Sequence, residues 1–200
     1  MDARSLRSGR RRAGAALCAS VWAGVSCTPR GMPADSGGGP ATLDPERILL
    51  PAGAWTLVPG DDHPFADTAS AAEDCPSVAY KEEAGFFEVE SDQCAFGVFT
   101  QPLATGIEAG ETVEFVAWHL DLWAPEPAEA RVVMQIGAEV LWEQIFAVPG
   151  PEDIQVRSFT FTEDVPAGTP AWWHVANHGY NSWRVGDVET VLPEGASGAR

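Results

Sequence analysis

Residues 112–122 read TVEFVAWHLDL and form the longest alternating run in the chain. Alternate residues belong to two faces, one with Val113, Phe115, Ala117, His119 and Asp121, the other with Thr112, Glu114, Val116, Trp118, Leu120 and Leu122. A period of two is typical of a β-strand whose two faces meet different surroundings. Because Trp118 shares its face with three aliphatic residues, we expect it to be buried.

Short strand-like runs separated by turns lie on both sides of this segment. They cover residues 48–50, 55–58, 86–90, 94–99, 131–136, 140–143, 154–162, 171–176 and 183–191. Sixteen prolines and twenty glycines favour short strands and turns over long helices. Strands at this spacing predict one all-β domain, an antiparallel sandwich over residues 46–193.

Four pieces of this domain resemble a known family when taken in order. They are AGETVEF at 109–115, the hairpin at 132–142, VPAGT at 165–169, and the closing strand at 181–191. Over residues 84–192 they are similar to galactose-binding-like jelly rolls, the fold of many carbohydrate-binding modules. The resemblance implies a jelly-roll β-sandwich that binds sugars through exposed aromatic and amide side chains. We expect no cofactor, although the resemblance allows a structural calcium, for which the sequence offers no clear ligand set.

The N-terminal residues have the pattern of an export signal. Five arginines in the first twelve residues precede a short apolar run to residue 26, too short to span a bilayer. Val25-Ser26-Cys27 resembles the end of a bacterial lipobox, in which the cysteine is lipidated, although Gly24 departs from the usual aliphatic residue. We expect a signal peptide at 1–26, a flexible tether at 27–45 and a disordered tail at 194–200. The predicted location is the cell envelope, as a membrane-anchored lipoprotein or a secreted or periplasmic protein.

Charge and cysteines restrict the partners and the compartment. The net charge of −17 disfavours nucleic acid and anionic lipid, and is also what solubility alone would require. We therefore expect no nucleic-acid partner, and contact with the membrane through the lipid anchor only. The protein is expected to be a monomer. Cys75 and Cys94 are the one cysteine pair in the predicted domain, which in an exported protein indicates a disulfide. Two free thiols in a reducing compartment are the alternative.

The segment from Trp172 to Trp183 holds the densest group of aromatic, histidine and amide side chains. Its candidate ligand-binding residues are Trp172, His174, Asn177, His178, Tyr180 and Asn181. Tyr180 and Trp172 would stack on a sugar, and the amides and histidines would hydrogen-bond its hydroxyl groups. The alternative is that both asparagines serve the turn and that Tyr180 covers the core. Trp172 and Trp173 alternate, so one should be buried and the other more exposed; Trp142 and Trp183 are expected in the core.

A metal site is the second possibility for these histidines. His174 and His178 would lie about 13 Å apart on an extended strand, too far for one zinc ion. His178 could join His174 only if the chain leaves the strand at residues 177–179 and curls back. If neighbouring strands also bring His119 and Asp121 to His174, a cluster of His119, Asp121, His174 and His178 could hold a metal for an enzyme. Histidines hydrogen-bonded at the sheet edge are the alternative. The sequence therefore predicts a non-catalytic domain that binds carbohydrate or a cell-surface glycan. A metal-dependent enzyme and a structural or partner-protein-binding envelope lipoprotein remain the alternatives.

Overall fold

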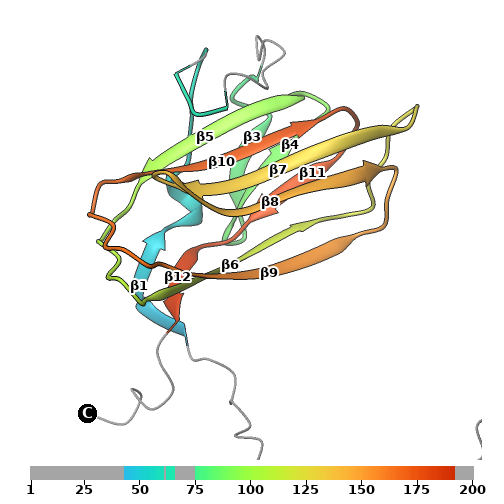
Figure 1. Ribbon diagram of the computed structural model, residues 1–200. Helices are drawn as coiled ribbons and strands as arrows, with labels where there is room; N and C mark the ends of the chain where they lie inside the picture. Colours follow the sequence, from blue (N-terminus) through green and yellow to red (C-terminus); the bar gives the residue numbers. More distant parts are fainter. Residues whose placement is uncertain (1–42, 61, 66–74, 192–200) are drawn as a thin grey trace, which may run out of the picture. The chain divides into compact units, whose positions relative to one another are not determined.

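The strands fall into two antiparallel sheets, as the sequence predicts (Figure 1). A computed structural model describes residues 43–60, 62–65 and 75–191, which all belong to one compact unit spanning residues 38–200. In chain order the elements are β1 (Leu43–Leu50), the 3-10 helix η1 (Ala52–Ala54), β2 (Thr56–Leu57), β3 (Tyr80–Glu83), β4 (Phe86–Glu90), β5 (Phe96–Pro102), β6 (Thr112–His119), β7 (Ala128–Ile136), β8 (Glu139–Val148), β9 (Asp153–Thr160), β10 (Pro170–Asn177), β11 (Ser182–Val185) and β12 (Val188–Val191).

The seven-stranded sheet has the order β1-β12-β6-β11-β4-β3, with β9 on the other side of β6. The five-stranded sheet has the order β2-β5-β10-β7-β8. The predicted strand at 183–191 is therefore two strands, β11 and β12. Between them the Asp187 carboxylate accepts a hydrogen bond from the backbone N–H of Ala52 at 2.7 Å.

Aromatic side chains from both sheets form the core between them. The rings of Phe87 and Phe99 lie 4.9 Å apart, and those of Phe146 and Trp183 lie 5.1 Å apart. Trp173 has no exposed surface and stacks on Trp142, with centroids 6.2 Å apart. These contacts confirm the predicted antiparallel β-sandwich and the predicted core positions of the tryptophans at 142 and 183, with 173 as the buried member of its pair.

Trp118 corrects one expectation about the faces of β6. Its neighbours Phe115, Ala117 and His119 are buried between the sheets, whereas Trp118 is half-buried on the outer face of the seven-stranded sheet. The Arg184 guanidinium lies 4.2 Å from the centroid of the Trp118 ring. The prediction was wrong because a cation from the adjacent strand, rather than a second apolar layer, covers this ring.

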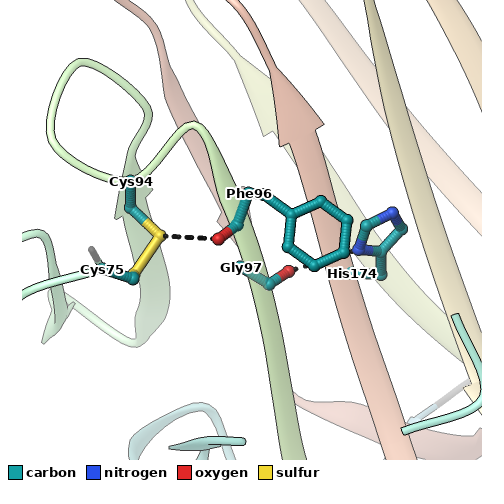
Figure 2. The surroundings of a disulfide bond; sticks show 5 residues. All are labelled: Cys75, Cys94, Phe96, Gly97 and His174. Carbon is teal, nitrogen blue, oxygen red and sulfur yellow. Dashed lines mark hydrogen bonds between the residues drawn. A yellow bond between two sulfur atoms is a disulfide. The ribbon is translucent and has the colours of Figure 1, made fainter. Parts of the chain in front are cut away.

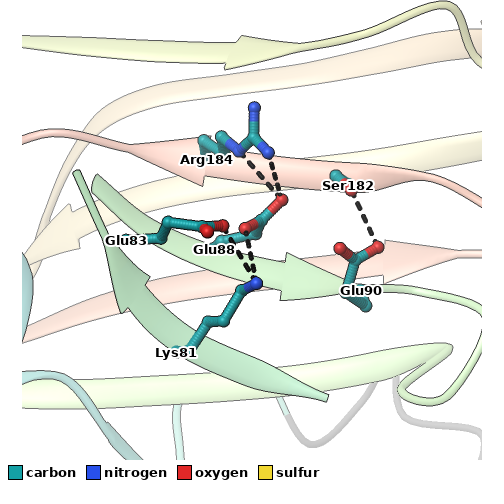
Figure 3. Close-up of polar contacts among 6 residues, drawn as sticks. All are labelled: Lys81, Glu83, Glu88, Glu90, Ser182 and Arg184. Carbon is teal, nitrogen blue, oxygen red and sulfur yellow. Dashed lines mark hydrogen bonds and ion pairs between the residues drawn. The ribbon is translucent and has the colours of Figure 1, made fainter. Parts of the chain in front are cut away.

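Arg184 also serves a buried carboxylate. Glu88 is 1% exposed, and both Nε and an Nη of Arg184 donate to its Oε1, at 2.9 and 2.5 Å (Figure 3). Lys81 approaches the other oxygen from β3 at 3.7 Å. The carboxylate is held between two cations from flanking strands, the arrangement that a buried charge requires.

The predicted signal peptide, the tether and lipidation site at Cys27, and the tail at 194–200 lie outside the described residues and stay predictions. In the described ranges, no helix has the length and apolarity needed to cross a membrane.

Candidate functional site

The loop between β10 and β11 passes from one sheet to the other at one end of the sandwich. It begins at Asn177, the last residue of β10 in the five-stranded sheet, and ends where β11 starts in the seven-stranded sheet. Two other connections lie against it: the turn after β4, which contains Ser91, and the β6–β7 loop, which contains Trp123. Three segments distant in sequence therefore build one end of the domain.

The two asparagines of the loop are buried and support it from inside. Asn177 is 1% exposed and Asn181 is 5% exposed. The Asn177 side-chain amide donates to the Ser91 hydroxyl at 2.5 Å, and the Asn181 side-chain amide donates to the Asn177 Oδ1 at 3.2 Å. The Ser91 hydroxyl accepts from the Asn181 backbone N–H at 3.1 Å and donates to the Gly179 carbonyl at 3.0 Å. The amides predicted to contact a ligand thus hold the loop in place.

Tyr180 and Trp123 form an exposed aromatic pair. Their ring centroids lie 5.1 Å apart with an interplanar angle of 36°, and their side chains are 61% and 53% exposed. Two hydrogen bonds join their segments: the Tyr180 backbone N–H donates to the Trp123 carbonyl at 3.1 Å, and the Trp123 backbone N–H donates to the side-chain oxygen of Asn181 at 2.6 Å. These hydrogen bonds fix two large rings side by side without burying them.

Glycine at 179 is required by the close approach of the two loops. A Cβ at Gly179 would lie 2.4 Å from the Trp123 carbonyl oxygen and 2.7 Å from the Asn181 amide nitrogen. Both distances are shorter than nonbonded contacts allow. The absence of a side chain at this position therefore permits the pairing of Tyr180 with Trp123.

A cleft of about 1000 Å³ opens beside the Tyr180 ring of this pair, and we name it the end cleft. It is lined by Ser91, Asp92, Ala95, Ala124, Pro125, Glu126, Pro127, Ala128, Glu129, Ala147, His178, Gly179 and Tyr180. Its walls combine proline and alanine surface with three carboxylates, an imidazole and the Tyr180 ring. A cleft of this size, with apolar walls and a few polar groups, is typical of a small-molecule binding site.

Of the six predicted ligand-binding residues, His178 and Tyr180 line the end cleft. Trp172 and His174 lie on the outer face of the five-stranded sheet and are not among the residues lining the cleft. Trp172 is the more exposed member of the tryptophan pair, as expected. The sequence analysis did not single out Trp123, which contacts Tyr180, or the three carboxylates that line the cleft. Trp123, Asp92 and Glu126 lie in connections without periodicity, and Glu129 is the second residue of β7. The signal available for Trp123 was a tryptophan outside any alternating run, shortly before Pro125 and Pro127.

His174 is enclosed by aromatic rings. It has no exposed surface, stacks on Phe65 at 4.7 Å and contacts Phe96 at 4.8 Å. Its Nδ1 lies 3.3 Å from the carbonyl of Gly97, in the strand that follows Cys94 (Figure 2). Burial, followed by the charge of Arg131, lowers the pKa of His174 to about 3. A neutral, covered imidazole cannot hydrogen-bond a sugar at the surface.

The predicted His/Asp metal cluster is not assembled, which corrects that alternative. His119 packs between the sheets, 4.9 Å from the Phe146 ring and 4.7 Å from the Trp183 ring, and its Nδ1 lies 2.8 Å from the Leu120 carbonyl. His174 lies on the far side of the five-stranded sheet, and Asp121 accepts a hydrogen bond from the backbone of Glu152 at 2.9 Å. In the part of the chain that the structure describes, no group of three or more histidine, cysteine or acidic side chains is placed to hold a metal ion.

The predicted disulfide is present between Cys75 and Cys94 (Figure 2). Cys94 is fully buried and ends the turn whose Ser91 and Asp92 line the end cleft. The backbone N–H of Cys94 donates to the carbonyl of Glu90 at 3.1 Å. The disulfide thus fixes one wall of the cleft to the segment that precedes β3.

Comparisons with known proteins give structural neighbours only. No protein-family model matches the chain, and no curated protein matches it. Among solved structures it is similar to a family 4 carbohydrate-binding module, with 14% identity and a TM-score of 0.38 over 70% of this chain and 88% of that one. A family 61 module in complex with β-1,4-galactotriose shares 9% identity, with a TM-score of 0.36 over 74% of this chain and 99% of that one. The K3 adhesin domain of Lys-gingipain from Porphyromonas gingivalis shares 11% identity, with a TM-score of 0.41 over 73% of this chain and 97% of that one.

Proposed function

We propose that this chain is a non-catalytic glycan-binding domain that holds carbohydrate in the end cleft. The observation that carries the proposal is the exposed pair of Trp123 and Tyr180, held together by hydrogen bonds of their backbone N–H groups. Tyr180 lines the end cleft, and Trp123 lies against Tyr180 next to Ala124, which also lines it. Aromatic faces pack against the C–H faces of sugar rings, and the tips of tyrosine and tryptophan can donate hydrogen bonds. Rings that are already fixed lose little conformational freedom when a ligand binds.

The polar groups of the cleft match the second requirement of a sugar. Asp92, Glu126 and Glu129 can accept hydrogen bonds from hydroxyl groups, and His178 can donate or accept. Asn177 and Asn181 are buried beneath the loop surface, where they hold the loop that carries Tyr180. In this proposal Trp123 therefore replaces Trp172 as the partner of Tyr180 in stacking.

A glycan array followed by calorimetric titration of the full chain tests the proposal. We expect Tyr180→Ala and Trp123→Ala each to weaken binding about tenfold or more, whereas Tyr180→Phe keeps the ring and most of the affinity. Ile154→Ala is the matched control, because Ile154 is 68% exposed on the outer face of the seven-stranded sheet. Unchanged affinity in both alanine variants would remove the end cleft as the site. Titration with and without EDTA tests whether a structural calcium contributes.

We also propose that the domain is exported and anchored through a lipid on Cys27. The arginine-rich start, the apolar run and Val25-Ser26-Cys27 support this. In a bacterial host that processes lipoproteins, the wild-type chain should incorporate a clickable fatty acid and sediment with membranes. Cys27→Ser should do neither, and equal labelling of both chains would exclude Cys27 as the anchor.

Binding to an envelope protein is the second candidate, favoured by an apolar strip on the outer face of the seven-stranded sheet. Ile154 and Val156 are 68% and 53% exposed, and they pair across the strands with Trp118 and Val116. An exposed apolar surface of this kind is typical of interaction sites. If this strip binds a protein, Ile154→Lys with Val156→Lys should abolish a defined cross-linked complex and leave glycan binding unchanged.

A further inference from the structure

The charged side chains that line the end cleft are acidic and come from separate segments. Asp92 lies in the turn after β4, Glu126 in the β6–β7 loop and Glu129 near the start of β7. All three side chains are exposed. Among the described residues that line the cleft, none is a lysine or an arginine.

The cations of the described chain have partners elsewhere. Four of its basic residues form ion pairs: Arg47 with Glu111 at 2.8 Å, Lys81 with Glu83 at 2.9 Å, Arg131 with Glu143 at 2.7 Å, and Arg184 with Glu88 at 2.5 Å. The fifth, Arg157, lies 5.8 Å from the centroid of the Trp142 ring. The carboxylates of the cleft are therefore left without a cation, in contrast to Glu88 and Glu143.

A ligand that covers the cleft must compensate these carboxylates for lost water. Removing water from an ionised carboxylate is unfavourable unless donors or positive charge replace it. A hydroxyl group offers one donor, whereas a protonated amine offers three donors and a charge, which makes a stronger hydrogen bond. A uronate or a sulfate in the cleft would add a negative charge that the three acidic residues repel.

From this we infer that the end cleft selects glycans with protonated amines, such as chains of unacetylated hexosamine, over neutral and anionic glycans. The Trp123–Tyr180 pair stacks on the sugar rings, and the side chains of Asp92, Glu126 and Glu129 receive the amine N–H groups. The inference rests on the proposed function, because it names the ligand class of the same site.

The test compares three oligosaccharides of equal length by calorimetry with the full chain at about pH 5.5, where the sugar amines are protonated. They are a glucosamine tetramer, its fully N-acetylated counterpart and a galacturonate tetramer. We expect the amine form to bind about tenfold more tightly than the acetylated form at low salt, and the galacturonate not to bind. The double variant Glu126→Gln with Glu129→Gln should remove most of this preference. Glu163→Gln is the control, since Glu163 is exposed in the β9–β10 connection and does not line the cleft.

The possible outcomes distinguish the amine preference from the proposed function. Equal binding of the amine and acetylated forms, both abolished by Tyr180→Ala, would overturn the amine preference and leave the proposed function standing. If the affinity for the glucosamine tetramer is unchanged in Tyr180→Ala and in the double variant, the inferred preference is overturned as well. Such a result would show a general attraction of the amine to an acidic protein. Failure of every glycan, on the array as in calorimetry, would overturn the proposed function itself.

Discussion

The carbonyl oxygen of Trp123 lies 2.4 Å from the position that a Cβ of residue 179 would take. Trp123 and Gly179 therefore fit together only because residue 179 is a glycine. Gly179 precedes Tyr180, and Tyr180 N–H donates to the same carbonyl oxygen at 3.1 Å. The approach of two backbones thus sets the position of both rings.

Gly179→Ala should therefore impair binding more than folding. The added methyl must push the β10–β11 loop away from Trp123, which separates the aromatic pair. We expect glycan affinity to fall about tenfold or more in calorimetry, with a smaller loss of stability in thermal unfolding. Gly53→Ala is the control, because a Cβ there would meet only Glu82 at an ordinary 3.6 Å. Full affinity in Gly179→Ala would show that the loop's position is irrelevant to the ligand.

Ser91→Ala should destabilise the domain. Ser91 is 3% exposed, and its hydroxyl has three partners in the loop, so removal leaves the Asn177 side-chain amide and the Asn181 backbone N–H unsatisfied. We expect a loss of about 2–3 kcal/mol in the free energy of unfolding, measured with urea. Ser158→Ala removes one exposed hydrogen bond, to Glu114, and should cost less than about 0.5 kcal/mol. Similar losses in the two variants would contradict the supporting role of Ser91.

The disulfide should contribute substantially to stability. Cys75 and Cys94 are 19 residues apart in sequence, and closing a loop of this length stabilises by about 3 kcal/mol in the chain-entropy model. Urea unfolding with and without reductant should show this difference in the wild-type chain. The double variant Cys75→Ala with Cys94→Ala should match the reduced protein and be insensitive to reductant. A wild-type midpoint that reductant does not move would argue against the prediction.

His174 should make the domain less stable as the pH falls. Its pKa is lowered to about 3 in the folded chain by burial, while the unfolded chain takes up the proton near the ordinary value of about 6.5. Between these values the unfolded state binds more protons, so the free energy of unfolding decreases with falling pH, by up to about 1.4 kcal/mol per pH unit.

Replacing the imidazole isolates this contribution from that of the carboxylates. Between about pH 6 and pH 4, His174→Gln should lose roughly 2 kcal/mol less stability than the wild-type chain in urea unfolding. His178→Gln, at an exposed position, should follow the wild-type profile. Parallel profiles for all three proteins would mean that His174 takes up its proton while folded.

Strand periodicity was sufficient to predict the sandwich but not the function of individual side chains. The alternation at 112–119 located β6, and the Trp172–Trp173 alternation correctly separated a buried ring from a more exposed one. The buried face of β6 was chosen wrongly because both faces carry apolar residues, and the deciding neighbour, Arg184, is supplied by another strand.

The residues of the candidate site were predicted only in part, because contacts between segments distant in sequence decide which side chains line it. The sequence singled out the loop from Asn177 to Asn181, and Tyr180 and His178 do line a cleft. It could not show that both asparagines are used internally, because their partner Ser91 lies 86 and 90 residues away. Trp123 belongs to a loop without periodicity, so only the folded chain brings it to Tyr180.

Ser91, Asn177 and Asn181 form a buried hydrogen-bond network at the end cleft. Ser91 lines the cleft, whereas the two asparagines do not. The side chains that would contact a ligand, such as Asp92, Glu126 and His178, are exposed and contribute little to the stability of the fold. Evolution could therefore exchange them freely and retain the same framework, which would let relatives of this chain diverge in ligand preference while their architecture stays constant.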